Sequence, residues 1–116
     1  MLKSNAYEIT RGETFSIRFR FRPEQLEVGN IKDIYLAVVQ GVNKTITFLG
    51  EESGDWQINN LDNSVTYHFT QEETLSLKAG LRVYLEAHVL DIFGERSKAF
   101  GGTYLVEDTE YPEVMT

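Results

Sequence analysis

The segment Leu81-Arg-Val-Tyr-Leu-Glu-Ala-His-Val-Leu90 carries the clearest pattern in the sequence. Its apolar residues occupy every second position, and this spacing places side chains on one face of a β-strand. The face expected to be buried consists of Leu81, Val83, Leu85, Ala87 and Val89, and the opposite face of Arg82, Tyr84, Glu86 and His88. We therefore predict a strand over residues 81–90, with one face in the core and the rest of the chain packed around it.

Turn residues follow this strand directly, in the stretch Asp91-Ile-Phe-Gly94. An aspartate can bond its own backbone and a glycine can adopt positive φ, so the stretch is typical of a hairpin turn. We expect residues 95–100 to return antiparallel. The pair Gly101 and Gly102 then predicts a bulge or bend before a last strand over residues 103–106.

A second one-sided strand is predicted over residues 14–22, because apolar and polar residues alternate along the stretch. Its inward face consists of Phe15, Ile17, Phe19 and Phe21, and its outward face of Ser16, Arg18, Arg20 and Arg22. Pro23 lacks a backbone N–H and ends the strand. The polar residues 23–29 are expected to form a long surface loop.

Residues 31–40 are apolar at both odd and even positions, so this strand is expected to be central or covered on both faces. A turn over residues 41–44 leads into a short strand over residues 45–49, which is rich in β-branched and aromatic side chains. Further elements are expected as short strands over residues 7–10 and 65–69 and as a polar loop over residues 50–55.

One helical turn is predicted over residues 71–75. Thr70 and Glu73 have the spacing of a capping box, in which each side chain bonds the backbone N–H of the other residue. Leu75 and Leu77 are expected to close one end of the fold, and Trp56 to cap one end of the core.

Seven or eight short strands, with turns roughly every 8 to 12 residues and almost no helix, predict an all-β fold. The expected architecture is an antiparallel immunoglobulin-like β-sandwich with one short helical turn, and a small barrel is the alternative. We assign residues 1–106 to this domain and residues 107–116 to an acidic C-terminal arm.

The composition narrows the possible partners. A chain of 116 residues is the size of one domain, and its formal net charge of -7 repels phosphate backbones, so we expect no nucleic acid partner. The sequence has no cysteine, which suits a reducing compartment and excludes a thiol nucleophile or thiolate metal site. We find no signal peptide pattern and no apolar stretch long enough to span a bilayer, so no membrane partner is expected.

No motif predicts catalysis or a bound cofactor. His68 and His88 lie within alternating strands and are expected to point outward without a third metal ligand. The oxygen-bearing residues from Asp55 to Asp62 raise the possibility of calcium, but their spacing is not that of an EF-hand loop. A solvated loop is favoured there, and we expect neither a metal site nor an enzyme.

Three stretches resemble small β-sandwich proteins from the structural gene clusters of tailed phages and prophages of Gram-positive bacteria, including the N-terminal domains of baseplate upper proteins. The stretches are Ile9-Thr-Arg-Gly-Glu-Thr-Phe15, Ile31-Lys-Asp-Ile-Tyr35, and Thr70-Gln-Glu-Glu-Thr-Leu75 followed by Leu81 to Leu90. The resemblance brings no catalytic residue. It implies a virion or virion-assembly component that acts through its surfaces, made in the bacterial host cytoplasm and located in the virion.

Two functions of different class follow. The first is a noncatalytic virion structural or adaptor protein, in the tail, baseplate or head, that binds other virion proteins, with a homo-oligomer as an open alternative. The second is a carbohydrate- or cell-wall-binding module that uses Trp56 and Tyr84 as stacking platforms. The candidate interaction residues fall into three groups. Arg18, Arg20 and Arg22 form a basic row that docks an acidic partner or pairs with a neighbouring strand. Trp56 and Tyr84 are the stacking platforms, and Tyr111, Val114 and Met115 are anchors in the arm.

Overall fold

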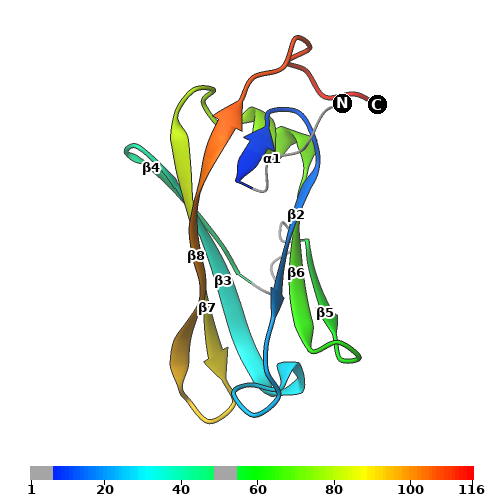
Figure 1. The fold of residues 1–116 in the computed structure, drawn as a ribbon, viewed down its shortest axis with the longest axis vertical. Coiled ribbons are helices and arrows are strands. Elements are labelled where there is room, and N and C mark those ends of the chain that lie inside the picture. Colours follow the sequence, from blue (N-terminus) through cyan, green and yellow to red (C-terminus); the bar gives the residue numbers. More distant parts are fainter. Residues whose placement is uncertain (1–6, 49–54) are drawn as a thin grey trace.

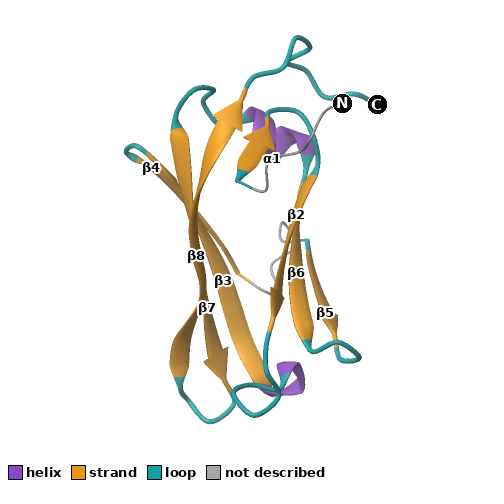
Figure 2. Cartoon of the chain, viewed as in Figure 1, coloured by secondary structure: helices purple, strands orange, loops and turns teal. Residues whose placement is uncertain are grey.

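The computed structural model describes residues 7–48 and 55–116, which form eight strands in two sheets packed face to face (Figures 1 and 2). The strands are β1 Glu8–Thr10, β2 Phe15–Arg20, β3 Ile31–Gln40, β4 Asn43–Phe48, β5 Trp56–Asn59, β6 Ser64–Phe69, β7 Arg82–Asp91 and β8 Arg96–Glu107. A 3-10 turn, η1 Val28–Asn30, and one helical turn, α1 Gln71–Leu75, complete the elements. The polar loop predicted over residues 50–55 lies, except for its last residue, outside the described residues.

The strand order confirms the predicted β-sandwich. One sheet has the order β1-β8-β7-β3-β4 and the other the order β2-β6-β5. The segments β8-β7-β3 and β2-β6-β5 have the order of strands G-F-C and B-E-D in immunoglobulin-like domains. Most neighbouring strands are antiparallel, as expected, but β1 pairs parallel with β8, with Glu8 opposite Leu105. The two sheets remain separate, so the barrel alternative is wrong.

Strand β7 lies inside the larger sheet, between β8 and β3. The inward residues Val83, Leu85, Ala87 and Val89 are at most 1% exposed, which confirms the predicted core face. Leu81 was expected on the same face, and this prediction is wrong, because its side chain is 50% exposed. It precedes Arg82, the first residue that pairs with β8, and so lies beyond the edge of the covered sheet.

The core is filled by aromatic and aliphatic side chains from both sheets. Ile17 and Phe19 on β2 are buried as predicted, and Tyr67 on β6 is buried among other rings. The ring centroid of Tyr67 lies 4.8 Å from that of Phe69 and 4.9 Å from that of Trp56. Each large side chain buried in this way contributes roughly 1.5–3 kcal/mol relative to an exposed one.

The predicted capping box is present at α1, which closes one end of the sandwich (Figure 1). Thr70 Oγ1 accepts from the backbone N–H of Glu73 at 3.2 Å, and the Glu73 carboxylate accepts from the backbone N–H of Thr70 at 2.9 Å. The other carboxylate oxygen of Glu73 accepts from the buried Tyr67 hydroxyl at 2.5 Å. Leu77 is buried below the turn, as expected, and Leu75 is half-buried. The cap therefore fixes α1 to the core of the smaller sheet.

The bulge expected at Gly101 and Gly102 lies elsewhere. Both glycines stay in the ladder with β7, and the register shifts earlier, so that Ala99 is the extra residue. A Cβ at position 101 would lie 2.8 Å from the Tyr84 hydroxyl oxygen, and one at position 102 would lie 2.8 Å from the Phe100 ring. The glycines therefore make room for neighbouring side chains, and the bulge predicted at them is instead at Ala99.

Candidate functional site

The outer face of the five-stranded sheet, which is turned away from the core, gathers aromatic side chains from three strands. Tyr35 on β3 is opposite Phe48 on β4 and His88 on β7, and residues directly opposite each other share a face of the sheet. A cavity of about 230 Å³ opens here, which we call the aromatic pocket. Its lining includes Asp33, Tyr35, Phe48, His88, Leu90 and Arg96.

The walls of the aromatic pocket are held by direct contacts. The Tyr35 and His88 rings are stacked, with centroids 5.2 Å apart and planes 6° from parallel, and the Phe48 ring lies 5.6 Å from the Tyr35 ring. The Arg96 guanidinium lies 5.4 Å from the centre of the Tyr35 ring and donates to the Tyr35 hydroxyl at 2.6 Å. Three rings and one guanidinium thus form a preorganised surface.

Charged groups continue along the outer face beside the pocket. The Glu86 carboxylate accepts from the Tyr84 hydroxyl at 2.9 Å and lies 2.8 Å from His88 Nε2. The hydrogen bond from Tyr84, followed by that with His88, lowers the pKa of Glu86. Contact with Tyr84 raises the pKa of Lys98, whose ammonium lies 3.6 Å from Glu86. Both side chains therefore stay charged at neutral pH.

Strand β4 forms the edge of this sheet and adds exposed apolar surface. Ile46 is 44% exposed and Phe48 is 39% exposed. Ile46 is opposite Ala37 of β3, so both lie on the same outer face as the aromatic pocket. Branched and aromatic side chains on an edge strand, next to unpaired backbone groups, are typical of a surface that another protein covers.

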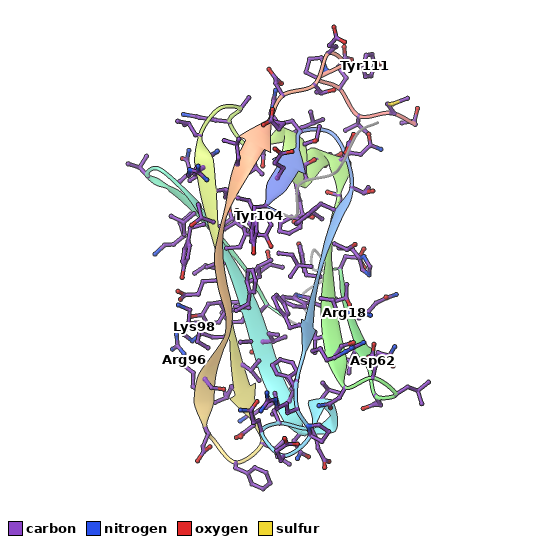
Figure 3. All side chains as sticks on the ribbon, viewed as in Figure 1. Arg18, Asp62, Arg96, Lys98, Tyr104 and Tyr111 are labelled. Carbon is purple, nitrogen blue, oxygen red and sulfur yellow. The ribbon has the colours of Figure 1, made fainter. Side chains whose placement is uncertain are left out.

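The predicted basic row lies on the outer face of the smaller sheet, on the other side of the molecule (Figure 3). Arg18 and Arg20 lie 3.4 Å and 3.7 Å from one carboxylate oxygen of Asp62, so they pair with the β5–β6 turn. A hydrogen bond from Ser64 and then the charges of both arginines lower the pKa of Asp62. Arg22 lies beyond the end of β2 and is exposed.

The two predicted stacking platforms are engaged in internal contacts. Trp56 is half-buried at the margin of the core, where its ring packs against Tyr67 and lies 6.5 Å from the Phe19 ring. Tyr84 lies on the outer face of the larger sheet, with the ammonium of Lys98 5.9 Å from its ring centre. Both rings are therefore engaged within the fold.

The arm over residues 107–116 crosses the end of the sandwich near α1 and is held at two points. Arg11 Nη1 donates to the Asp108 carboxylate at 2.6 Å, and the side-chain amide of Gln71 bonds both backbone groups of Met115. A backbone bond from Thr109 and then the Arg11 guanidinium lower the pKa of Asp108. Between the tethers, Tyr111 is 54% exposed.

The polar side chains of His68 and Asn59 bond other residues of the same chain. Ser16 Oγ lies 2.6 Å from His68 Nδ1, and Gln57 Oε1 lies 3.1 Å from His68 Nε2, on the outward face predicted for this histidine. In the turn weighed as a calcium site, Asn59 Oδ1 accepts from the backbone of Leu61. Over residues 7–48 and 55–116, no group of three or more His, Asp or Glu side chains is placed to hold a metal ion.

Sequence reasoning missed the aromatic pocket, although one signal was present. The apolar residues at odd and even positions of 31–40 predicted apolar surface on both faces of this strand. The strands that bring Phe48 and Arg96 beside Tyr35 could not be predicted from spacing. Within the described part of the chain, no helix is long and apolar enough to cross a membrane.

The chain matches no model of a known protein family. A search of curated proteins finds no match either.

Proposed function

We propose that this protein is a noncatalytic structural or adaptor protein of a tailed-phage or prophage virion, and that it acts through protein–protein contacts. The observation that supports its mode of action is the outer face of the five-stranded sheet. The resemblance of three sequence stretches to phage β-sandwich proteins supports the virion setting.

The outer face has the features of a protein-binding surface. Aromatic residues and arginine are enriched at the centres of protein interfaces, where a few such side chains supply most of the binding energy. Tyr35, Phe48 and Arg96 form such a group, and their mutual contacts hold them in place before a partner arrives. The exposed Ile46 adds an apolar rim along the β4 edge. Binding to this surface therefore needs little reorganisation of side chains.

Glycan binding fits the geometry less well. A sugar ring stacks on the free face of an exposed aromatic side chain, with polar groups placed around it. Trp56 packs into the margin of the core, and Tyr84 is held by Glu86 and Lys98. These contacts favour the structural or adaptor role.

The test is incorporation into particles. The chain is expressed together with the structural proteins encoded beside its gene, particles are purified by density gradient, and their proteins are identified by mass spectrometry. We expect the parent chain in particles or assembly intermediates, and a strong loss of incorporation for Phe48→Glu. The control is Leu61→Glu, at a fully exposed position on the β5–β6 turn. A parent chain absent from every particle fraction, or normal incorporation of Phe48→Glu, would contradict the proposal.

A further inference from the structure

We propose that the acidic arm of one copy inserts Tyr111 into the aromatic pocket of a second copy, so that molecules join head to tail. The inference rests on the proposed function in treating the outer face as a protein-binding surface, and it names the occupant of that surface.

The arm is built to present Tyr111. Asp108 is tied to Arg11 at one end of the segment, and Met115 is tied to Gln71 at the other. The residues between the tethers form an exposed loop at one end of the molecule, with Tyr111 on it (Figure 3). Pro112 restricts the backbone directly after Tyr111. An aromatic side chain on a segment fixed at both ends loses less conformational entropy on docking than one on a free tail.

The aromatic pocket matches a tyrosine in size and chemistry. A cavity of about 230 Å³ is small for a drug-sized ligand and suits a single inserted side chain. Its walls offer the rings of Tyr35 and Phe48 for offset or edge-to-face contact, a geometry that adds to the apolar area buried. Tyrosine is also among the residues that most often serve as an interface anchor.

Charge complementarity favours the acidic arm as the segment that occupies the aromatic pocket. The arm contains four carboxylates, and two of them, Glu110 and Glu113, flank Tyr111. The pocket carries Arg96 in its lining, and Lys98, opposite His88 on the next strand, is paired with Glu86 at 3.6 Å. The pocket carboxylate of Asp33 accepts from the backbone N–H of Ile34 at 2.8 Å. Since the chain has a net charge of -7, two copies repel each other, and a contact that sets the carboxylates of the arm beside the Arg96 guanidinium offsets part of that repulsion.

The arm and the pocket lie far apart within one molecule. Strand β8 begins at Arg96, beside the pocket, and ends at Glu107, where the arm starts. Twelve residues of strand span roughly 40 Å, and the molecule is 46 Å long. Figure 3 places Tyr111 at one end and Arg96 and Lys98 in the opposite half. The tethers hold the arm over α1, so the pocket is filled from a second copy, and the contact is heterologous, closing into a ring or continuing as a stack.

The experiment uses the purified full chain and two variants, each altered at an exposed position. Tyr111→Ala removes the anchor, and Arg96→Glu reverses the charge at the pocket. Sedimentation is measured against concentration for the parent, for each variant and for their equimolar mixture. We expect the parent to grow beyond dimers, each variant to stay monomeric, and the mixture to form one-to-one dimers only, because it contains one intact type of contact.

A labelled peptide with the sequence of residues 107–116 provides a second measurement. It is expected to bind the Tyr111→Ala chain, whose pocket is free, and to bind Arg96→Glu at least about tenfold more weakly, as for loss of an interface anchor. The same peptide with alanine in place of the tyrosine should bind neither.

Three results would overturn the inference. In the first, the parent stays monomeric at roughly 1 mM, where even weak contacts form, and the peptide does not bind. In the second, either variant assembles like the parent. In the third, the parent assembles but the mixture of variants stays monomeric, because the arm of Arg96→Glu then does not dock in the pocket of Tyr111→Ala. If the chain is found in particles, each of these three results contradicts the inference and leaves the proposed function in place. A chain that assembles but is absent from particles contradicts the proposed function and leaves the inference in place.

Discussion

The side-chain amide of Gln71 bonds the backbone of Met115 at two points: its Nε2 donates to the carbonyl oxygen at 2.9 Å, and its Oε1 accepts from the N–H at 2.8 Å. This geometry resembles that of one strand residue bonded to another. Gln71→Ala should release the end of the arm and leave the free energy of unfolding within about 0.5 kcal/mol of the parent, as for most surface changes. Cleavage after Glu110 and Glu113 by a glutamate-specific protease should become faster. Equal rates for Gln71→Ala and a Gln25→Ala control would mean that the two bonds do not hold the arm.

Leu85 and Leu81 provide a matched test of the core face of β7. Leu85 is buried, and Leu81 is half exposed although the alternation of the sequence places both on one face. Leu85→Asp should prevent folding, because an unpaired buried carboxylate costs several kcal/mol against a total stability of roughly 5–15 kcal/mol. Leu81→Asp should fold with nearly the parent melting temperature. Circular dichroism melts decide this, and a folded Leu85→Asp chain would place the core elsewhere.

The buried hydroxyl of Thr74 joins α1 to the turn between β1 and β2. Its oxygen accepts from the Gly12 N–H at 3.0 Å and donates to the Glu13 carbonyl at 2.9 Å. Thr74→Val keeps the shape and leaves both groups unpaired, so we expect a loss of about 1–3 kcal/mol in urea unfolding. Thr74→Ser, which keeps the hydroxyl, should lose less. A valine variant as stable as the serine variant would show that the bonds contribute little.

Asn63 organises the loop between β2 and β3 from a distant turn. Its side chain accepts from Val28 N–H at 2.9 Å and donates to the carbonyls of Phe21 and Leu26 at 2.9 Å and 2.8 Å, and its own φ is 54°. Asn63→Gly should cost about 2–3 kcal/mol from the lost bonds. Asn63→Ala should cost about 1 kcal/mol more, because left-handed backbone strains a residue with a Cβ. Chemical unfolding of both variants separates the two effects, and equal stabilities would exclude the strain term.

The phenol of Tyr67 should make stability fall at alkaline pH. Burial and then the hydrogen bond to the Glu73 carboxylate raise the pKa of Tyr67 well above its ordinary value of 10.0. The folded state therefore holds the proton more tightly than the unfolded state, so its contribution is complete below pH 10 and is lost as the pH rises above that value. Tyr67→Phe should show a flatter decline of unfolding free energy between about pH 10 and 11. The exposed Tyr111→Phe serves as the control, and identical slopes in all three chains would refute this assignment.

Much of the fold could be predicted from local pattern. The strands over residues 65–69 and 81–90 follow from alternation, and the strand over 31–40 follows from apolar residues on both faces. The capping box of Thr70 and Glu73 is formed as its spacing indicates. These features depend on neighbours within a few residues, which is the range over which side-chain spacing and capping act.

The sites depend on pairing between distant segments, which spacing does not determine. Phe48 and Arg96 meet at Tyr35 because the sheet order places β4 and β7 on either side of β3 and β8 beyond β7. Asp62, which pairs with two predicted interaction arginines, comes from a turn more than 40 residues further along the chain. The bulge at Ala99 likewise depends on the register between β7 and β8, which spacing along one segment does not determine.

The parallel pairing of β1 with β8 has a mechanical consequence. The Tyr7 carbonyl accepts from Leu105 N–H at 2.8 Å, and the Glu107 carbonyl accepts from Arg11 N–H at 2.9 Å. Tension applied between the segment before β1 and the arm pulls these two strands in opposite directions along a common axis. The bonds between them are then loaded together in shear and do not open one at a time as a zipper. We expect a high unfolding force in single-molecule pulling through these two points, and a much lower one when the pull is applied across the β7–β8 hairpin; equal forces would argue against shear loading.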